Sequence, residues 1–153
     1  MQRILAVIQK KPSFFLFLGI LYSIVIIILQ WGVQPTWDML WFFFGAVIGI
    51  YLLDIFEVFL HISPSPARSI IFVVGLLLVS FFIVSSSGSV FAVGVTLLSF
   101  ATTLEWMWGQ WVTHKELDSW YVMVAGPIDR RLQRTMLYGI TVLFFVINWF
   151  FIR

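Results

Sequence analysis

Long apolar runs separated by short polar breaks dominate this chain. Each run covers about 18 to 25 residues, and about 20 apolar residues suffice to carry one α-helix across a ~30 Å hydrocarbon core. The breaks are rich in helix-ending residues, as in Ser63-Pro64-Ser65-Pro66 and in the segment from Ser85 to Gly88. The pattern therefore predicts an all-α membrane bundle with five transmembrane helices, at residues 14–31, 37–61, 68–85, 89–113 and 132–152.

The composition supports this fold class and narrows the chemistry. Of the 153 residues, 61% are hydrophobic and 10% are charged, which is more apolar than a soluble domain can bury. We therefore expect a single bundle over residues 1–153 with almost no soluble domain. Cysteine is absent, so disulfides, iron–sulfur clusters and thiolate zinc sites are excluded. No cofactor is predicted, and a divalent metal would need carboxylate, imidazole or amide ligands.

The basic residues predict the orientation in the membrane. With the N-terminus inside, only Arg153 lies on the outer side, and all other cations fall on the cytoplasmic side. These are Arg3, Lys10, Lys11, Arg68, Lys115, Arg130, Arg131 and Arg134. We expect an N-in, C-out protein of the plasma or inner membrane. Its cations are expected to contact anionic lipid at the cytoplasmic face, with no nucleic-acid partner.

Four ionisable residues stand inside or at the end of the predicted spans. Asp54, Glu57 and His61 are three and four residues apart, so they follow one stripe of the second predicted helix. Glu105, on the fourth predicted helix, is expected at a similar depth in the inner leaflet. A charged side chain at the centre of a span costs about 2.5 to 3.5 kcal/mol, so such groups face a bundle interior, a partner charge or a water-filled path.

Three uses of this cluster remain open. Arg68, at the start of the third predicted helix, can pair with a carboxylate and so merely fix how the helices meet. Alternatively, Asp54, Glu57, His61 and Glu105 can carry protons or bind a cation. The third use is a metal site with Glu57, His61 and Glu105 as ligands.

Small residues indicate close helix contacts. Gly45 and Gly49 form a GxxxG pair on the face of their helix opposite to Asp54. Gly94, Ala101 and Gly109 lie on the same stripe of the fourth predicted helix as Glu105. Contacts on two faces indicate either central helices or an oligomer, and for the GxxxG pair we favour packing within the chain.

These features favour a small integral membrane subunit that supports or regulates a membrane assembly or a homo-oligomer. The expected partners are other membrane subunits or further copies of the chain. The alternatives are a proton- or cation-handling transporter component and, less favoured, a metal-dependent enzyme acting on lipid. A water-filled cleft at the acids would support the alternatives. A dry network closed by Arg68 would support the structural role.

Overall fold

The computed structural model describes residues 13–60, 68–124 and 128–153, and within these ranges the chain is helical and contains no strand. The all-α fold class is thereby confirmed. The helices are α2 (Ser13–Trp31), α3 (Trp37–Leu60), α4 (Ile70–Ser86), α5 (Val90–His114), α6 (Asp118–Tyr121) and α7 (Arg130–Ile152). Predicted and observed helix ends differ by at most two residues wherever they can be compared.

Four of the described helices, α2, α3, α5 and α7, are long and apolar enough to cross a membrane. The fifth predicted span corresponds to α4, which is apolar but has 17 residues. Serines bound it on both sides: the Ser69 side chain accepts a hydrogen bond from the Phe72 amide, and Ser87 follows its last turn. The chain is thus a helical bundle of membrane type, and the number and direction of its spans remain predictions.

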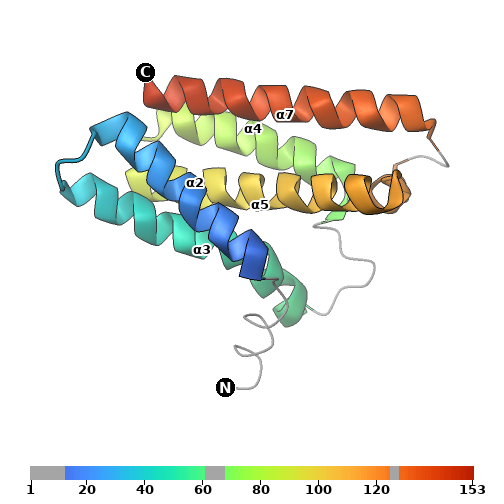
Figure 1. Cartoon of the computed structure of the whole chain (residues 1–153), viewed down its shortest axis with the longest axis horizontal. Coiled ribbons are helices and arrows are strands. Elements are labelled where there is room, and N and C mark those ends of the chain that lie inside the picture. Colours follow the sequence, from blue (N-terminus) through green and yellow to red (C-terminus); the bar gives the residue numbers. More distant parts are fainter. Residues whose placement is uncertain (1–12, 61–67, 125–127) are drawn as a thin grey trace.

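Helix α5 lies at the centre of the bundle (Figure 1). The helices α2 and α3 lie on one side of it, and α4 and α7 lie on the other. α2 crosses the bundle obliquely and reaches α7, where the Tyr22 hydroxyl donates a hydrogen bond to the Asn148 side-chain oxygen. Because α5 contacts every other long helix, the polar side chains on its different faces meet different neighbours.

Glycines bring the backbones of α3 and α5 into direct contact. A Cβ atom at Gly45 would lie 2.2 Å from the Phe91 carbonyl oxygen, and one at Gly49 would lie 2.3 Å from the Val95 oxygen. From the other side, a Cβ at Gly94 would lie 2.4 Å from the oxygen of Phe42. No larger residue fits at these three positions without moving a helix, so this glycine contact fixes the rotation of α5 relative to α3.

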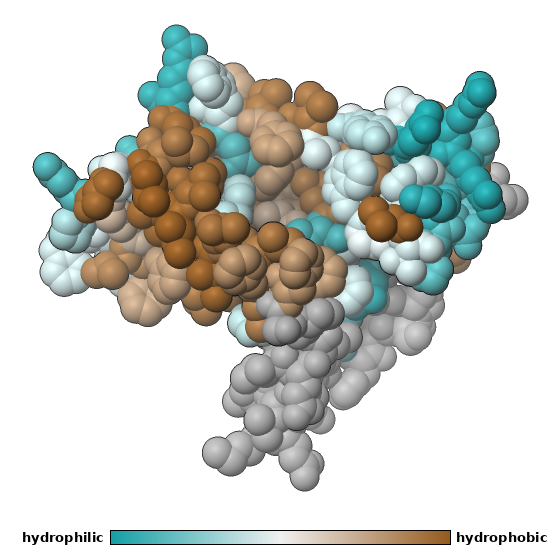
Figure 2. Space-filling model, viewed as in Figure 1, coloured by the Kyte–Doolittle hydropathy of each residue, from teal (hydrophilic) through white to brown (hydrophobic). Residues whose placement is uncertain are grey.

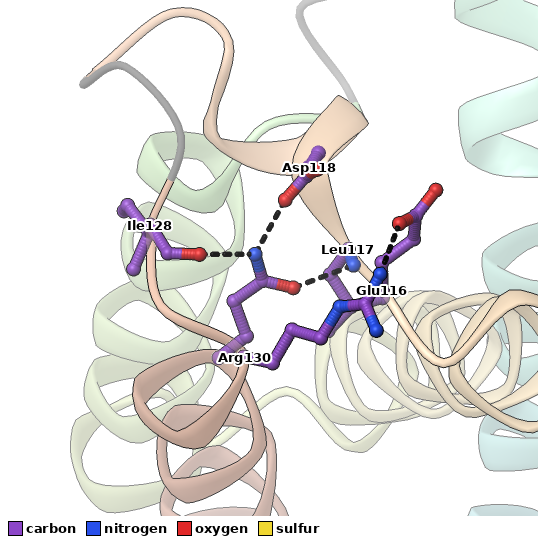
Figure 3. A network of polar contacts seen from close by, with 6 residues as sticks. Glu116, Leu117, Asp118, Ile128 and Arg130 are labelled. Atoms are coloured by element: carbon purple, nitrogen blue, oxygen red, sulfur yellow. Dashed lines mark hydrogen bonds and ion pairs between the residues drawn. The ribbon is translucent and has the colours of Figure 1, made fainter.

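At the opposite end of α5, a buried glutamine holds the connection to α7 in place. Gln133 is fully buried, and its side-chain oxygen accepts a hydrogen bond of 2.7 Å from the Leu117 amide. Its amide nitrogen donates to Asp118 Oδ1 at 2.5 Å and to the Ile128 oxygen at 2.9 Å. Figure 3 shows these partners beside the exposed ion pair of Glu116 and Arg130. A single side chain of α7 therefore ties the start of that helix to α6 and to Leu117, which lies between α5 and α6.

Candidate functional site

An ion pair between Glu57 and Arg68 joins α3 to the segment before α4. Arg68 Nε donates to Glu57 Oε1 at 2.8 Å, and Arg68 Nη2 donates to Glu57 Oε2 at 3.2 Å. The two groups thus meet in the planar bidentate geometry that suits guanidinium and carboxylate. The Glu57 side chain is 10% exposed and that of Arg68 is 40% exposed. The carboxylate is therefore the buried partner and the guanidinium is the one nearer to the surface.

Aromatic rings surround the ion pair. The guanidinium carbon of Arg68 lies 4.7 Å from the centre of the Trp106 ring, which is a cation–π distance. Trp106 also stacks on Phe15, with ring centres 5.4 Å apart and nearly parallel planes. The group formed by Glu57, Arg68, Trp106 and Phe15, called the aromatic ion pair below, connects α3, α5, α2 and the segment before α4.

The space beside Asp54 and the aromatic ion pair is nearly filled. Asp54 is 3% exposed, and the cavity between it and Glu57, Arg68 and Trp106 has a volume of about 10 Å³. The smallest cavity that holds one water molecule has a volume of about 10–15 Å³. Among the described residues, this site therefore has room for at most one water and shows no channel.

Glu105 lies in a different place from Asp54 and Glu57. It lines an open groove of about 700 Å³ between α2, α5 and α7, whereas the small cavity is lined from α5 by Thr102, Thr103 and Trp106. Ala101 and Gly109 also line this groove, which is separate from the glycine contact. The acids of α3 and the acid of α5 thus face two different spaces.

The two predicted metal ligands that the structure describes, Glu57 and Glu105, line different cavities. His61 lies outside the described residues, so the set of Glu57, His61 and Glu105 remains a prediction. Within the described ranges, no group of three histidine or acidic side chains is placed to hold a metal ion. Glu57 has Arg68 as an ion-pair partner, and that partner would have to leave before Glu57 could bind a cation.

Two important residues were not predicted from the sequence. Trp106 is one of these, although it follows Thr102 and Thr103 by one turn and so shares their face of α5. Gln133 has a clearer signal, because it stands on the same stripe as buried Leu137, Ile140 and Phe144. A polar residue in an apolar stripe indicates a buried hydrogen-bond network.

A tyrosine is buried at the end of the bundle where α6 lies. Tyr121 in α6 is 2% exposed, and its hydroxyl contacts the Met136 sulfur at 3.3 Å. Burial raises the pKa of the Tyr121 phenol above its ordinary value of 10.0, because the charged form would lose its hydration.

The chain matches no protein-family model, no curated protein and no solved structure.

Proposed function

We propose that this protein is a non-enzymatic integral membrane subunit that supports or regulates a membrane assembly or a homo-oligomer. The observation that carries the proposal is the aromatic ion pair. Arg68 binds both oxygens of Glu57, Trp106 covers it, and the neighbouring cavity holds about 10 Å³. A partly buried charge pair with so little adjacent space serves to fix helix positions rather than to exchange ions or bind a substrate.

In the proposed topology, five helices span the plasma or inner membrane, and the N-terminus lies in the cytoplasm. The 17 residues of α4 extend about 26 Å, a few ångströms less than a ~30 Å hydrocarbon core. Local thinning of the bilayer accommodates such a difference at a small free-energy cost. With α4 as a span, the chain returns to the predicted cytoplasmic side after α3 and after α5, which keeps Arg68, Lys115 and Arg130 there.

The arrangement of the acids argues against the alternative of proton or cation transport. A path across the bilayer needs polar groups at successive depths. Asp54 and Glu57 lie beside Thr102, Thr103 and Trp106, and Glu105 directly precedes Trp106, so all three acids lie within about one helix turn along α5. Deeper along α5, the Thr96 and Ser99 hydroxyls donate hydrogen bonds to backbone carbonyls. The three acids therefore lie at about one depth in the membrane and not at successive depths.

Two measurements test the proposal. The protein, extracted from its native membrane in mild detergent, is expected to run as an oligomer or with further membrane subunits in native gels and light scattering. A protein that is monomeric and alone at every detergent concentration tried would contradict the assembly role.

Ion flux in proteoliposomes tests the competing function. Wild type, Asp54→Asn, Glu57→Gln and Glu105→Gln are expected to show the same flux as empty liposomes, and protein purified without chelator is expected to contain no stoichiometric metal. A flux that the wild type produces and an acid variant loses would favour transport. A stoichiometric metal lost in Glu57→Gln would favour the lipid enzyme.

A further inference from the structure

The groove between α2, α5 and α7 has an apolar wall and one polar edge. Its lining includes Phe14, Leu18 and Leu21 from α2, Leu104 from α5 and Phe144 from α7. The polar edge is formed by Glu105 and by the hydroxyls of Thr113 and Thr141. Figure 2 shows this face of the protein, with apolar surface over α2 and hydrophilic side chains gathered at the end where α5 ends and α7 begins.

The length of the groove matches one leaflet of a bilayer. On the central helix α5 its lining runs from Ala101 to Thr113, which is about 18 Å of helix, and half of a ~30 Å hydrocarbon core is about 15 Å. Phe14 stands in the first turn of α2, where the chain enters the apolar span. The groove therefore extends from the membrane boundary at which α2 begins to about the middle of the bilayer.

The side chains in the groove suit a flexible chain better than a helix. Helices that associate in membranes use small residues to approach closely, as α3 and α5 do through Gly45, Gly49 and Gly94. The lining of the groove includes the small residues Ala101 and Gly109, but seven of its sixteen residues are phenylalanine or leucine. Trp108 is held in place there by a hydrogen bond of 3.0 Å from its Nε1 to Thr141. Large side chains separated by a deep space leave room for a thin acyl chain.

Cations lie at the boundary end of this groove. Arg134 precedes Thr141 by seven residues, so it lies on the groove-facing stripe of α7 about 10 Å closer to the start of that helix. Lys115 follows Thr113 at the end of α5. The side chains of Lys115 and Arg134 are exposed and make no ion pair with the described residues, whereas nearby Glu116 is paired with Arg130. This charge is complementary to a phosphate group.

We propose that the groove binds an anionic phospholipid from the leaflet at which α2 begins, with one acyl chain between α2, α5 and α7 and its phosphate near Arg134. Glu105 lies ten residues before Lys115, which is about 15 Å of helix, so it lines the deeper part of the groove and not the part near the phosphate. The inference rests on the membrane embedding proposed above but not on the assembly role.

Photolabelling in lipid nanodiscs tests this site. The probe is phosphatidylglycerol with a diazirine in one acyl chain, diluted into phosphatidylcholine, and labelled residues are mapped by mass spectrometry. Labelling is expected to concentrate on groove residues such as Leu18 and Leu104. Leu21→Trp and Val25→Trp place a large ring in the groove and are expected to reduce this labelling severalfold. Ile24→Trp is the matched control, since Ile24 is 43% exposed, close to the 45% of Leu21 and Val25, but lies outside the groove.

The contribution of the Arg134 charge to lipid binding is measured separately, as the preference for phosphatidylglycerol over phosphatidylcholine. One Arg near an anionic surface contributes about 1 kcal/mol, so Arg134→Gln is expected to lower the preference for phosphatidylglycerol over phosphatidylcholine about fivefold. Arg153→Gln, at the other end of α7, is expected to leave that preference unchanged. Labelling that merely follows side-chain exposure around α2, or that persists in Leu21→Trp and Val25→Trp, would overturn the proposal. A second protein chain cross-linked through groove residues would overturn it as well, whereas a monomer that retains the labelling would refute only the assembly role.

Discussion

Removing the two partners of the aromatic ion pair should destabilise the protein to unequal extents. Arg68→Gln leaves the Glu57 carboxylate, whose side chain is 10% exposed, without its guanidinium partner. Glu57→Gln instead leaves a guanidinium that is 40% exposed, can reach water and still lies over Trp106. The loss of the arginine is therefore expected to be the more damaging change.

The size of each effect follows from burial. Breaking a fully buried ion pair by removing one partner costs about 3–5 kcal/mol. Because Arg68 is partly exposed, solvent already screens the pair, and we expect Arg68→Gln to lower the free energy of unfolding by about 2–3 kcal/mol. For Glu57→Gln the remaining cation is hydrated and keeps its cation–π contact, so a loss of about 1 kcal/mol is expected. The double variant should lose less than the sum of the two single variants, by about 1 kcal/mol or more.

Reversible unfolding by dodecyl sulfate in mixed micelles, followed by tryptophan fluorescence, measures these differences. Arg130→Gln and Glu116→Gln serve as matched controls, because their ion pair is exposed and longer, at 3.4 Å. Each control is expected to change stability by at most about 0.5 kcal/mol. Equal losses for Arg68→Gln and Glu57→Gln, or strictly additive losses in the double variant, would refute the reasoning.

Three further predictions concern packing, hydrogen bonding and pH. Gly45→Ala places a methyl group against the α5 backbone and should destabilise the protein by about 2–3 kcal/mol in the same micelle assay, whereas Gly75→Ala, whose Cβ meets nothing within 4 Å, should change stability by less than about 1 kcal/mol. Gln133→Leu removes the hydrogen-bond partner of the buried Leu117 amide and of two less buried oxygens, on Asp118 and Ile128. Hydrogen exchange of residues 115–124 should therefore accelerate at least about tenfold, which exposed Gln34→Leu should not cause. The free energy of unfolding should fall as the pH rises above about 10, because the unfolded chain loses the Tyr121 proton at a lower pH than the folded chain does. Tyr121 contributes at most about 1.4 kcal/mol per pH unit to this slope, and Tyr121→Phe should reduce the slope. A slope identical in wild type and Tyr121→Phe would refute the last of these.

The helices could be predicted from the sequence because their ends are set by local chemistry. Apolar runs long enough to span stop where proline, glycine or serine clusters interrupt them, as at Gly32 and at Ser87. The spacing of Asp54 and Glu57 also placed both acids on one stripe, and the ion pair of Glu57 with Arg68 joins the two segments on either side of the proline-rich stretch. These inferences depend on one helix or on neighbours in the chain, where residue spacing determines position.

The neighbours of each helix face could not be predicted in the same way. Counting residues along α5 gives the depth of Glu105, but its direction depends on the rotation of α5, which the contacts of Gly45, Gly49 and Gly94 determine. With that rotation, Thr102, Thr103 and Trp106 face Asp54, and Glu105 faces α2 and α7. The depth of a residue thus follows from its position along its own helix. The direction in which its side chain points depends on how that helix packs against its neighbour.

The stacking of Phe15 on Trp106 gives the two sites a shared wall. Phe15 lines the groove, and Trp106 lies between Phe15 and the guanidinium that binds Glu57. A lipid chain that presses on Phe15 therefore bears on the same ring that holds Arg68. We therefore expect a lipid chain in the groove to limit the movement of Phe15 and, through the stacked rings, the movement of Trp106 over Arg68.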